Sequence, residues 1–247
     1  MNDVLLRAEN VSKHFGGLVA NDNVSLSVYK GKTHAILGPN GAGKSTLINM
    51  LSGDLTCSSG SVFLGNLDVT HLQPNERSLL GIGRSYQKTN IFPTFTVLEN
   101  CRLAAQSREP RLGAVFSSAS NYEPYKNLAE KAIWETGLEG YESRVASALS
   151  HGEQRQLELA IVLATQPSVL LLDEPLAGMG SEESFQMIDL LKKLVKTHGI
   201  LLVEHDMDAV FAIADIITVM VNGSVLMTDT PDRVRASAEV QQAYFGH

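Results

Sequence analysis

The 247-residue chain lacks most features that mark secreted or membrane-spanning proteins. It contains two cysteines, Cys57 and Cys101, whose spacing fits neither a disulfide framework nor a metal site, so we expect two reduced thiols of a cytosolic protein. Its most apolar late stretch, residues 209–221, is interrupted by Asp215, and no stretch reaches the roughly 20 residues that span a bilayer. The first nine residues also lack the charged-then-apolar pattern of a secretory leader.

Basic charge is scarce as well. The 20 Lys and Arg residues are outnumbered by 27 Asp and Glu residues, which gives a formal net charge of −7. Because nucleic-acid binding requires a basic patch, we expect no nucleic-acid partner. Hydrophobic residues make up 44% of this 26.7 kDa chain, which is enough for a sizeable core in one large domain with a subdomain or in two small domains.

One segment carries the complete phosphate-binding pattern G-x-x-x-x-G-K-[ST]. Its glycines let successive backbone N–H groups turn toward an anion, and a helix expected from about Lys44 adds its positive N-terminal end. Lys44 is placed to reach the β- and γ-phosphates of a nucleotide, and Ser45 carries the hydroxyl expected on Mg²⁺. The apolar run Thr33 to Leu37 precedes the loop as a strand should. The candidate nucleotide-binding residues here are Gly38, Pro39, Asn40, Gly41, Ala42, Gly43, Lys44, Ser45 and Thr46.

Two further apolar runs end in polar side chains. Val169 to Leu172 is uninterrupted, which suits a strand buried on both faces of a parallel sheet, and ligands bind at the carboxyl ends of such strands. Asp173 suits indirect coordination of Mg²⁺, while Glu174 can accept a proton from, or orient, the water that attacks the γ-phosphate. The alternative is that this Asp-Glu pair only caps a helix that follows the strand. His205 follows the run Ile200 to Val203 and can donate a hydrogen bond to a phosphate oxygen, or else cap the next helix.

The order of these motifs resembles that of the nucleotide-binding subunits of ABC transporters, over essentially all 247 residues. Phe15 falls at the family's adenine-stacking aromatic, although a lone phenylalanine is more often a core residue. Gln87 falls at the glutamine that senses Mg²⁺ and links the site to the membrane partner. Leu149 to Gln154 matches the signature sequence. The resemblance therefore implies Glu174, His205 and Gln87 as catalytic residues, and Ser45, Gln87 and Asp173 as metal-binding residues.

The signature implies a second ATPase subunit. In the family it caps the γ-phosphate of ATP held by the opposite subunit, and here Ser150, Gly152 and a helix from Glu153 to Ala164 supply the cap. Because one chain has one phosphate loop and one signature, two chains, identical or homologous, should meet head to tail around ATP. His151 and Gly180 depart from the family pattern, as does Glu153 in place of glutamine, and their effect on activity stays open.

The resemblance also implies the fold class, an α/β P-loop NTPase core of the ABC ATPase type with an N-terminal antiparallel β part and an inserted helical subdomain. Residues 1–87 and 149–247 should form the core and residues 88–148 the helical subdomain. From the pattern we expect a half-exposed strand at Val24 to Val28, and later a hairpin at Asn222-Gly223. We also expect the helices Val97 to Gln106 and Leu128 to Thr136, a polar Ser-rich stretch between Ser117 and Glu123, a helix at Met207, and a helix opened by Thr230 and Pro231.

Within the family, three segments are most similar to the branched-chain amino acid importer group: Leu149 to Arg155, Val203 to Met207, and Ala243 to Gly246. This implies ATP-driven uptake of branched-chain amino acids or related small amino acid, amide or carboxylate solutes, at the cytoplasmic face of the plasma membrane. Permease subunits would dock around Gln87 to Phe95, and an extracytoplasmic solute-binding protein would take part indirectly. The rings of Phe92 and Phe95 are either exposed for docking or buried inside the subdomain.

Three other functions remain open at this point. A soluble ABC ATPase acting on DNA or ribosomes shares these motifs, but such proteins usually carry two cassettes or a long coiled-coil insertion, and this chain has neither. An exporter ATPase is a second alternative. A subunit that switches conformation without hydrolysing ATP is the third, and the presence of Glu174 and His205 speaks against it.

Overall fold

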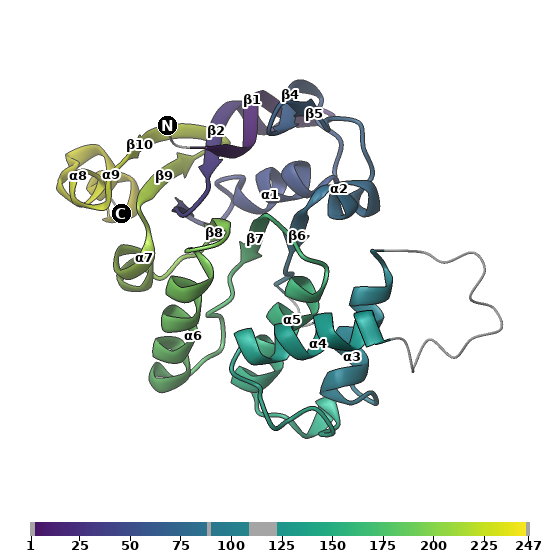
Figure 1. Cartoon of the computed structure of the whole chain (residues 1–247). Helices are drawn as coiled ribbons and strands as arrows, with labels where there is room; N and C mark the ends of the chain where they lie inside the picture. The colour runs from purple at the N-terminus through teal and green to yellow at the C-terminus, as the bar shows by residue number, and fades with distance from the viewer. Residues whose placement is uncertain (1–2, 88–89, 109–122, 246–247) are drawn as a thin grey trace.

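The computed structural model describes residues 3–87, 90–108 and 123–245. They form two β-sheets and a set of helices, arranged as Figure 1 shows. Residues 117–122 of the predicted Ser-rich stretch, and Gly246 of the predicted C-terminal pattern, lie outside the described residues.

The larger sheet has six strands in the order β10-β9-β3-β8-β7-β6. Neighbouring strands run parallel except for β10, which pairs antiparallel with β9. The strands are β3 (Thr33–Leu37), β6 (Ile82–Arg84), β7 (Val169–Asp173), β8 (Gly199–Val203), β9 (Ile216–Val221) and β10 (Ser224–Asp229). The predicted runs at Thr33, Val169 and Ile200 are thus confirmed as strands of one parallel sheet.

The central strands β7 and β8 are buried on both faces, which explains their uninterrupted apolar sequences. Along β7, Leu170 and Leu172 pack into one hydrophobic cluster, and Val169 and Leu171 pack into the other. Successive side chains of a strand point to opposite faces, so a strand between two packed layers needs an apolar residue at every position.

The smaller sheet is antiparallel, in the order β2-β1-β4-β5. Its strands are β1 (Val4–Phe15), β2 (Leu18–Tyr29), β4 (Ser59–Leu64) and β5 (Leu67–Asp68). Helix α1 (Lys44–Ser52) lies between the two sheets and buries Leu47, Ile48 and Leu51 in the cluster that both sheets share (Figure 1). The predicted alternation of Val24 to Val28 is confirmed, because Val24, Leu26 and Val28 all face this cluster.

Helices α3 (Val97–Gln106), α4 (Glu123–Glu135) and α5 (His151–Ala164) pack against one another below the sheet in Figure 1. The predicted helix from Val97 to Gln106 is confirmed, and α4 covers most of the predicted second helix. Helix α5 begins at His151, two residues before the prediction, because the Ser150 side chain caps it. A short 3-10 helix, Ala146–Ala148, precedes it.

The remaining helices border the sheet. They are α2 (Pro74–Leu80), α6 (Ser181–Leu194), α7 (Met207–Ile213), α8 (Pro231–Ala236) and α9 (Ala238–Phe245). The hairpin at Asn222-Gly223 is confirmed, with both residues at positive φ, as are the helices at Met207 and after Thr230. In the part of the chain that the structure describes, no helix has the length and apolar character to cross a bilayer.

Candidate functional site

The phosphate loop joins β3 to α1 and needs its glycines for two reasons. Gly41 and Gly43 have φ of 81° and 96°, in the left-handed region. A Cβ on Gly43 would lie 2.5 Å from the Ala20 carbonyl oxygen, and one on Gly38 would lie 2.4 Å from that of Met220. The loop therefore packs backbone to backbone against β2 and β9, where a side chain at Gly43 or Gly38 would not fit.

The ammonium group of Lys44 lies inside this loop. Its Nζ donates to the carbonyl oxygens of Gly38, at 2.6 Å, and Pro39, at 3.1 Å. Burial lowers the pKa of Lys44, while the carboxylates of Glu174 and Asp173 act in the opposite direction. A buried cation ringed by backbone groups at a helix N-terminus is suited to bind the phosphates of a nucleotide. Ser45 is exposed at the first turn of α1, where its hydroxyl is free to reach a ligand.

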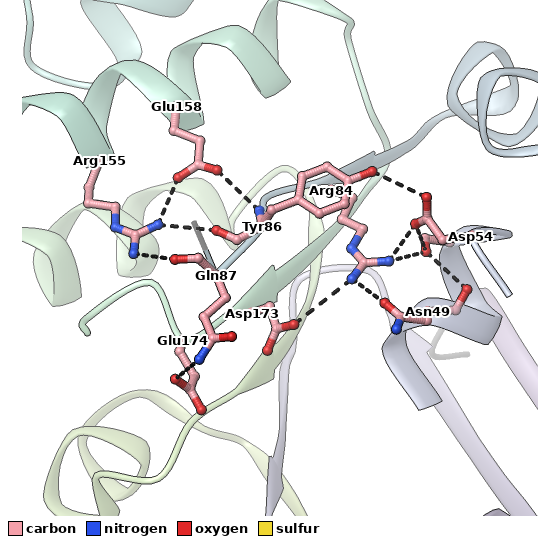
Figure 2. A network of polar contacts seen from close by, with 10 residues as sticks. Asn49, Asp54, Arg84, Tyr86, Gln87, Arg155, Glu158, Asp173 and Glu174 are labelled. Atoms are coloured by element: carbon pink, nitrogen blue, oxygen red, sulfur yellow. Dashed lines mark hydrogen bonds and ion pairs between the residues drawn. The ribbon is translucent and has the colours of Figure 1, made fainter. Parts of the chain in front are cut away.

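Three segments distant in sequence meet at the Glu174 carboxylate. Gln87 Nε2 donates to Glu174 Oε2 at 3.1 Å, as Figure 2 shows. His205 Nδ1 lies 3.7 Å from Glu174 Oε1. Glu174 itself has φ of 50°, an unusual conformation for a residue with a side chain, at the carboxyl end of β7. The structure thus brings together the three residues predicted as catalytic.

Asp173 ends β7 beside this group. Its carboxylate is nearly buried and lies 3.9 Å from the Arg84 guanidinium (Figure 2). Burial raises the pKa of Asp173, and the neighbouring Glu174 raises it further, although Arg84 and Lys44 act against both. A second cation at this point would stabilise the ionised carboxylate.

The sequence interpretation missed Glu204, which holds two parts of the site in place. Its buried carboxylate accepts hydrogen bonds from the backbone N–H groups of Leu176, at 3.0 Å, and His205, at 3.2 Å. Burial raises the pKa of Glu204, and these two hydrogen bonds oppose the shift. The available signal was an acidic residue directly after an uninterrupted apolar strand, the same signal that marked Asp173 and Glu174.

Three further charged residues near Gln87 were also missed. Arg84 contacts the side chains of Asn49, Ser52 and Asp54, and Arg155 and Glu158 contact the backbone next to Gln87 (Figure 2). Spacing in the sequence carried no signal for their contacts with the segment before Gln87 or with α1, because those partners are 30 or more residues away.

The signature residues form the N-terminus of α5. Ser150 Oγ accepts from the Glu153 N–H at 3.2 Å, and the Glu153 carboxylate accepts from the Ser150 N–H at 2.7 Å, which is a capping box. The Gly152 N–H donates to Glu183 at 3.3 Å, and the Gly180 N–H donates to the same carboxylate at 3.2 Å. His151 lies over the loop that follows Glu174, with Nε2 3.3 Å from the Ala177 carbonyl oxygen.

Phe15 lies at the end of β1 with 49% of its surface exposed, so it is not a core residue. The Lys13 ammonium lies 5.3 Å from the centre of its ring. An exposed ring of this kind can stack on a base, and the adenine-stacking role stays a prediction.

The parallel sheet, the phosphate loop that follows β3 and the two carboxylates at the carboxyl end of β7 define a P-loop ATPase. The chain belongs to the ABC transporter family, whose sequence model matches residues 21–177. It is thus an ATP-binding, ATP-hydrolysing cassette, and the fold class predicted from the sequence is confirmed.

Known relatives match the chain over most or all of its length. The high-affinity branched-chain amino acid transport ATP-binding protein LivG of Escherichia coli (strain K12) is 35% identical, with 100% of this chain and 99% of LivG covered. The ADP conformation of MJ1267, an ATP-binding cassette of an ABC transporter, superposes with a TM-score of 0.87 and 33% identity, covering 99% of each chain. A dimeric structure of MJ0796, a bacterial ABC transporter cassette, superposes with a TM-score of 0.77 and 26% identity. It covers 92% of this chain and 99% of that one.

Proposed function

We propose that this chain is the ATP-hydrolysing subunit of an importer for branched-chain amino acids, or for related small amino acid, amide or carboxylate solutes. The solute class is supported by the full-length likeness to LivG. The hydrolytic role is supported above all by the meeting of Gln87 and His205 at the Glu174 carboxylate.

The nucleotide's phosphates would lie in the loop from Gly38 to Thr46, with Lys44 on the β- and γ-phosphates and Phe15 against the adenine ring. Ser45, Gln87 and Asp173 carry the oxygen donors that Mg²⁺ prefers. Asp173 directly precedes Glu174 in the chain, and Gln87 is hydrogen-bonded to the Glu174 carboxylate, so these donors are close to one another. When bound, Mg²⁺ would neutralise charge on the β- and γ-phosphates.

Glu174 would take a proton from the attacking water as the water's oxygen bonds to the γ-phosphorus and the bond to the β–γ bridging oxygen breaks. Gln87 holds Oε2 of Glu174, so Oε1 would be the oxygen that accepts the proton. His205 would donate a hydrogen bond to a γ-phosphate oxygen. The Glu204 carboxylate holds the backbone of His205 by accepting a hydrogen bond from its N–H group. These side chains fix the orientation on which in-line attack depends.

The signature would complete the site of a second subunit. Ser150, Gly152 and Glu153 stand at the N-terminus of α5, where backbone N–H groups and the helix dipole favour an anion. We expect two subunits, identical or homologous, to enclose ATP head to tail, and the dimeric MJ0796 cassette supports such an assembly.

The subunit would act at the cytoplasmic face of the plasma membrane, held there by transmembrane permease subunits. A solute-binding protein outside the membrane would deliver the solute to the permease. The likeness to a transport ATP-binding protein supports this setting.

Substituting Glu174 with Gln tests the proposal. We expect ATP hydrolysis by the purified chain to fall at least about 100-fold, because a positioned general base contributes about 10²–10⁴-fold. The variant should still bind ATP, since the phosphate loop is unchanged, and should accumulate as a dimer in ATP and Mg²⁺. Steady-state phosphate release and size-exclusion chromatography measure the two effects.

The matched control is Glu130→Gln, the same chemical change on the exposed face of α4. It should leave hydrolysis and the elution volume unchanged. Equal hydrolysis by the Glu174→Gln variant and the unmodified chain would refute the catalytic assignment, and a monomer in ATP and Mg²⁺ would refute the enclosed dimer.

A further inference from the structure

Residues Arg84 to Gln87 connect the parallel sheet to the helical group, and Figure 2 shows that they are tied to both. On the sheet side, the Arg84 guanidinium contacts Asn49 and Asp54 near the end of α1 and lies 3.9 Å from Asp173. Its charge also lies 4.6 Å from the centre of the Tyr86 ring. The start of this segment is therefore anchored to the core.

On the other side, two charged residues of α5 hold the backbone of the same segment. Arg155 donates from Nη1 to the Tyr86 carbonyl oxygen at 3.1 Å and from Nη2 to the Gln87 carbonyl oxygen at 2.7 Å. Glu158 Oε1 accepts from the Tyr86 N–H at 3.1 Å, and its Oε2 accepts from Arg155 at 3.0 Å. We call Arg155 and Glu158 the α5 clamp.

Burying the two charged side chains of the α5 clamp costs free energy of desolvation. Its side chains are only 6% and 5% exposed, and burial raises the pKa of Glu158. Removing two charges from water costs more than packing apolar side chains of similar size, so a buried pair is weak evidence for a stabilising role. What this pair supplies is direction, because a planar guanidinium donates to two successive carbonyl groups in a fixed geometry.

Gln87, whose backbone the α5 clamp holds, also contacts the proposed catalytic carboxylate. Gln87 is held by its carbonyl group at Arg155, while its side-chain amide donates to Glu174. The same helix begins at the signature residues, less than two turns before Arg155. A rigid helix thus links the group that would cap a partner's ATP to the glutamine that contacts Glu174.

We propose that Arg155 and Glu158 are positioning residues that set Gln87 against Glu174 and tie this placement to the signature end of α5. The inference rests on the proposed roles of Glu174 and Gln87. Neither clamp residue touches the phosphate loop in the hydrogen bonds described, so the α5 clamp acts on the hydrolytic step and leaves nucleotide binding to the loop.

A double-mutant cycle between Arg155 and Gln87 tests this, with steady-state ATP hydrolysis measured on the purified full-length chain. Arg155→Ala should lower kcat about tenfold and change the KM for ATP less than about twofold. Because Arg155 acts through Gln87, the same substitution in a Gln87→Ala background should change kcat by less than about twofold. Arg155→Lys keeps the charge but loses the fork, so it should recover only part of the activity.

Urea unfolding of every variant separates positioning from folding. Glu158→Gln keeps an acceptor for the Tyr86 N–H and serves as the milder probe if Arg155→Ala does not fold, with an expected two- to fivefold loss of kcat that also vanishes in the Gln87→Ala background. If the fold-losses of kcat from the single substitutions multiply in the double variants, the proposal is overturned. If Gln87→Ala has full activity while Glu174→Gln has none, Gln87 plays no part in hydrolysis. The inference about the α5 clamp then fails, while the proposed function still stands.

Discussion

His34 shows how a single buried side chain sets a chain of hydrogen bonds between the two sheets. Its Nδ1 lies 2.8 Å from the Ser27 carbonyl oxygen, which can only accept, so Nδ1 carries the proton. Nε2 then accepts from the Thr218 hydroxyl at 2.7 Å, and Thr218 in turn accepts from Thr228 at 2.8 Å. Burial lowers the pKa of His34, because the charged imidazolium would lose its hydration in this interior.

This environment predicts a loss of stability in acid. Below about pH 6.5 the unfolded chain protonates His34 while the folded chain does not, so the free energy of unfolding falls as the pH falls toward the lower folded-state pKa. The slope from one proton is at most about 1.4 kcal/mol per pH unit. Urea unfolding between pH 7.5 and 5.5 should show that His34→Gln removes this component, whereas His71→Gln, on an exposed histidine, keeps it. Parallel pH curves for the unmodified chain and His34→Gln would contradict the prediction.

Helix α1, the helix of the phosphate loop, depends on a residue outside it. At its C-terminal end, the buried guanidinium of Arg77 donates to the carbonyl oxygens of Met50 and Leu51, both at 2.8 Å, and to that of Thr70 at 2.9 Å. The last carbonyl groups of a helix have no partners within it, and a cation there also complements the helix dipole. The phosphate-binding end of α1 is therefore stabilised from its opposite end.

We predict that Arg77→Ala lowers the free energy of unfolding by about 3 kcal/mol, because it leaves several buried carbonyl groups without partners. Urea unfolding at neutral pH measures this loss of stability. Arg77→Lys should show a smaller loss than Arg77→Ala. Arg233→Ala is the control, since Arg233 is an exposed arginine paired to Asp229 at 3.3 Å, and it should cost less than about 1 kcal/mol. Equal losses for Arg77→Ala and Arg233→Ala would show that Arg77 does not cap the helix.

At the scale of the whole molecule, the segment before α3 carries two exposed rings on the surface. Phe92 and Phe95 are 51% and 39% exposed and stack with their centres 5.3 Å apart. The buried side chain of Asn100 accepts from the Phe92 N–H at 2.8 Å and donates to its carbonyl oxygen at 3.1 Å. The backbone is thus held while the rings face outward, which answers the question of their burial and favours a docking role.

We predict that Phe92→Ala uncouples hydrolysis from transport in the complex with its permease reconstituted in vesicles. Fewer solute molecules should enter per ATP hydrolysed, because the substitution would remove apolar contact area from the surface where we expect the permease to dock. Phe185→Ala removes a ring of the same kind from the exposed face of α6 and should leave the ratio unchanged. An unaltered ratio in Phe92→Ala would exclude Phe92 from the coupling surface.

Residue type and spacing were enough to predict the strands that end at Asp173 and before His205, whereas Gln87 was identified only through the family resemblance. The phosphate loop was recognisable because its glycines and Lys44 are adjacent in the chain, and Asp173, Glu174 and His205 because each follows a buried strand. The start of α5 was missed by two residues, since the capping box of Ser150 and Glu153 lies within the signature itself.

The sequence by itself determined the class of chemistry, because a loop of nine consecutive residues and two strand ends contain the groups that bind and hydrolyse a nucleotide. The tertiary structure alone decided which charged residues hold those groups in place. Arg84, Arg155 and Glu158 are recognisable only from their partners, and buried charges find partners by proximity in space. Local pattern encodes what a segment presents, while packing decides what supports it.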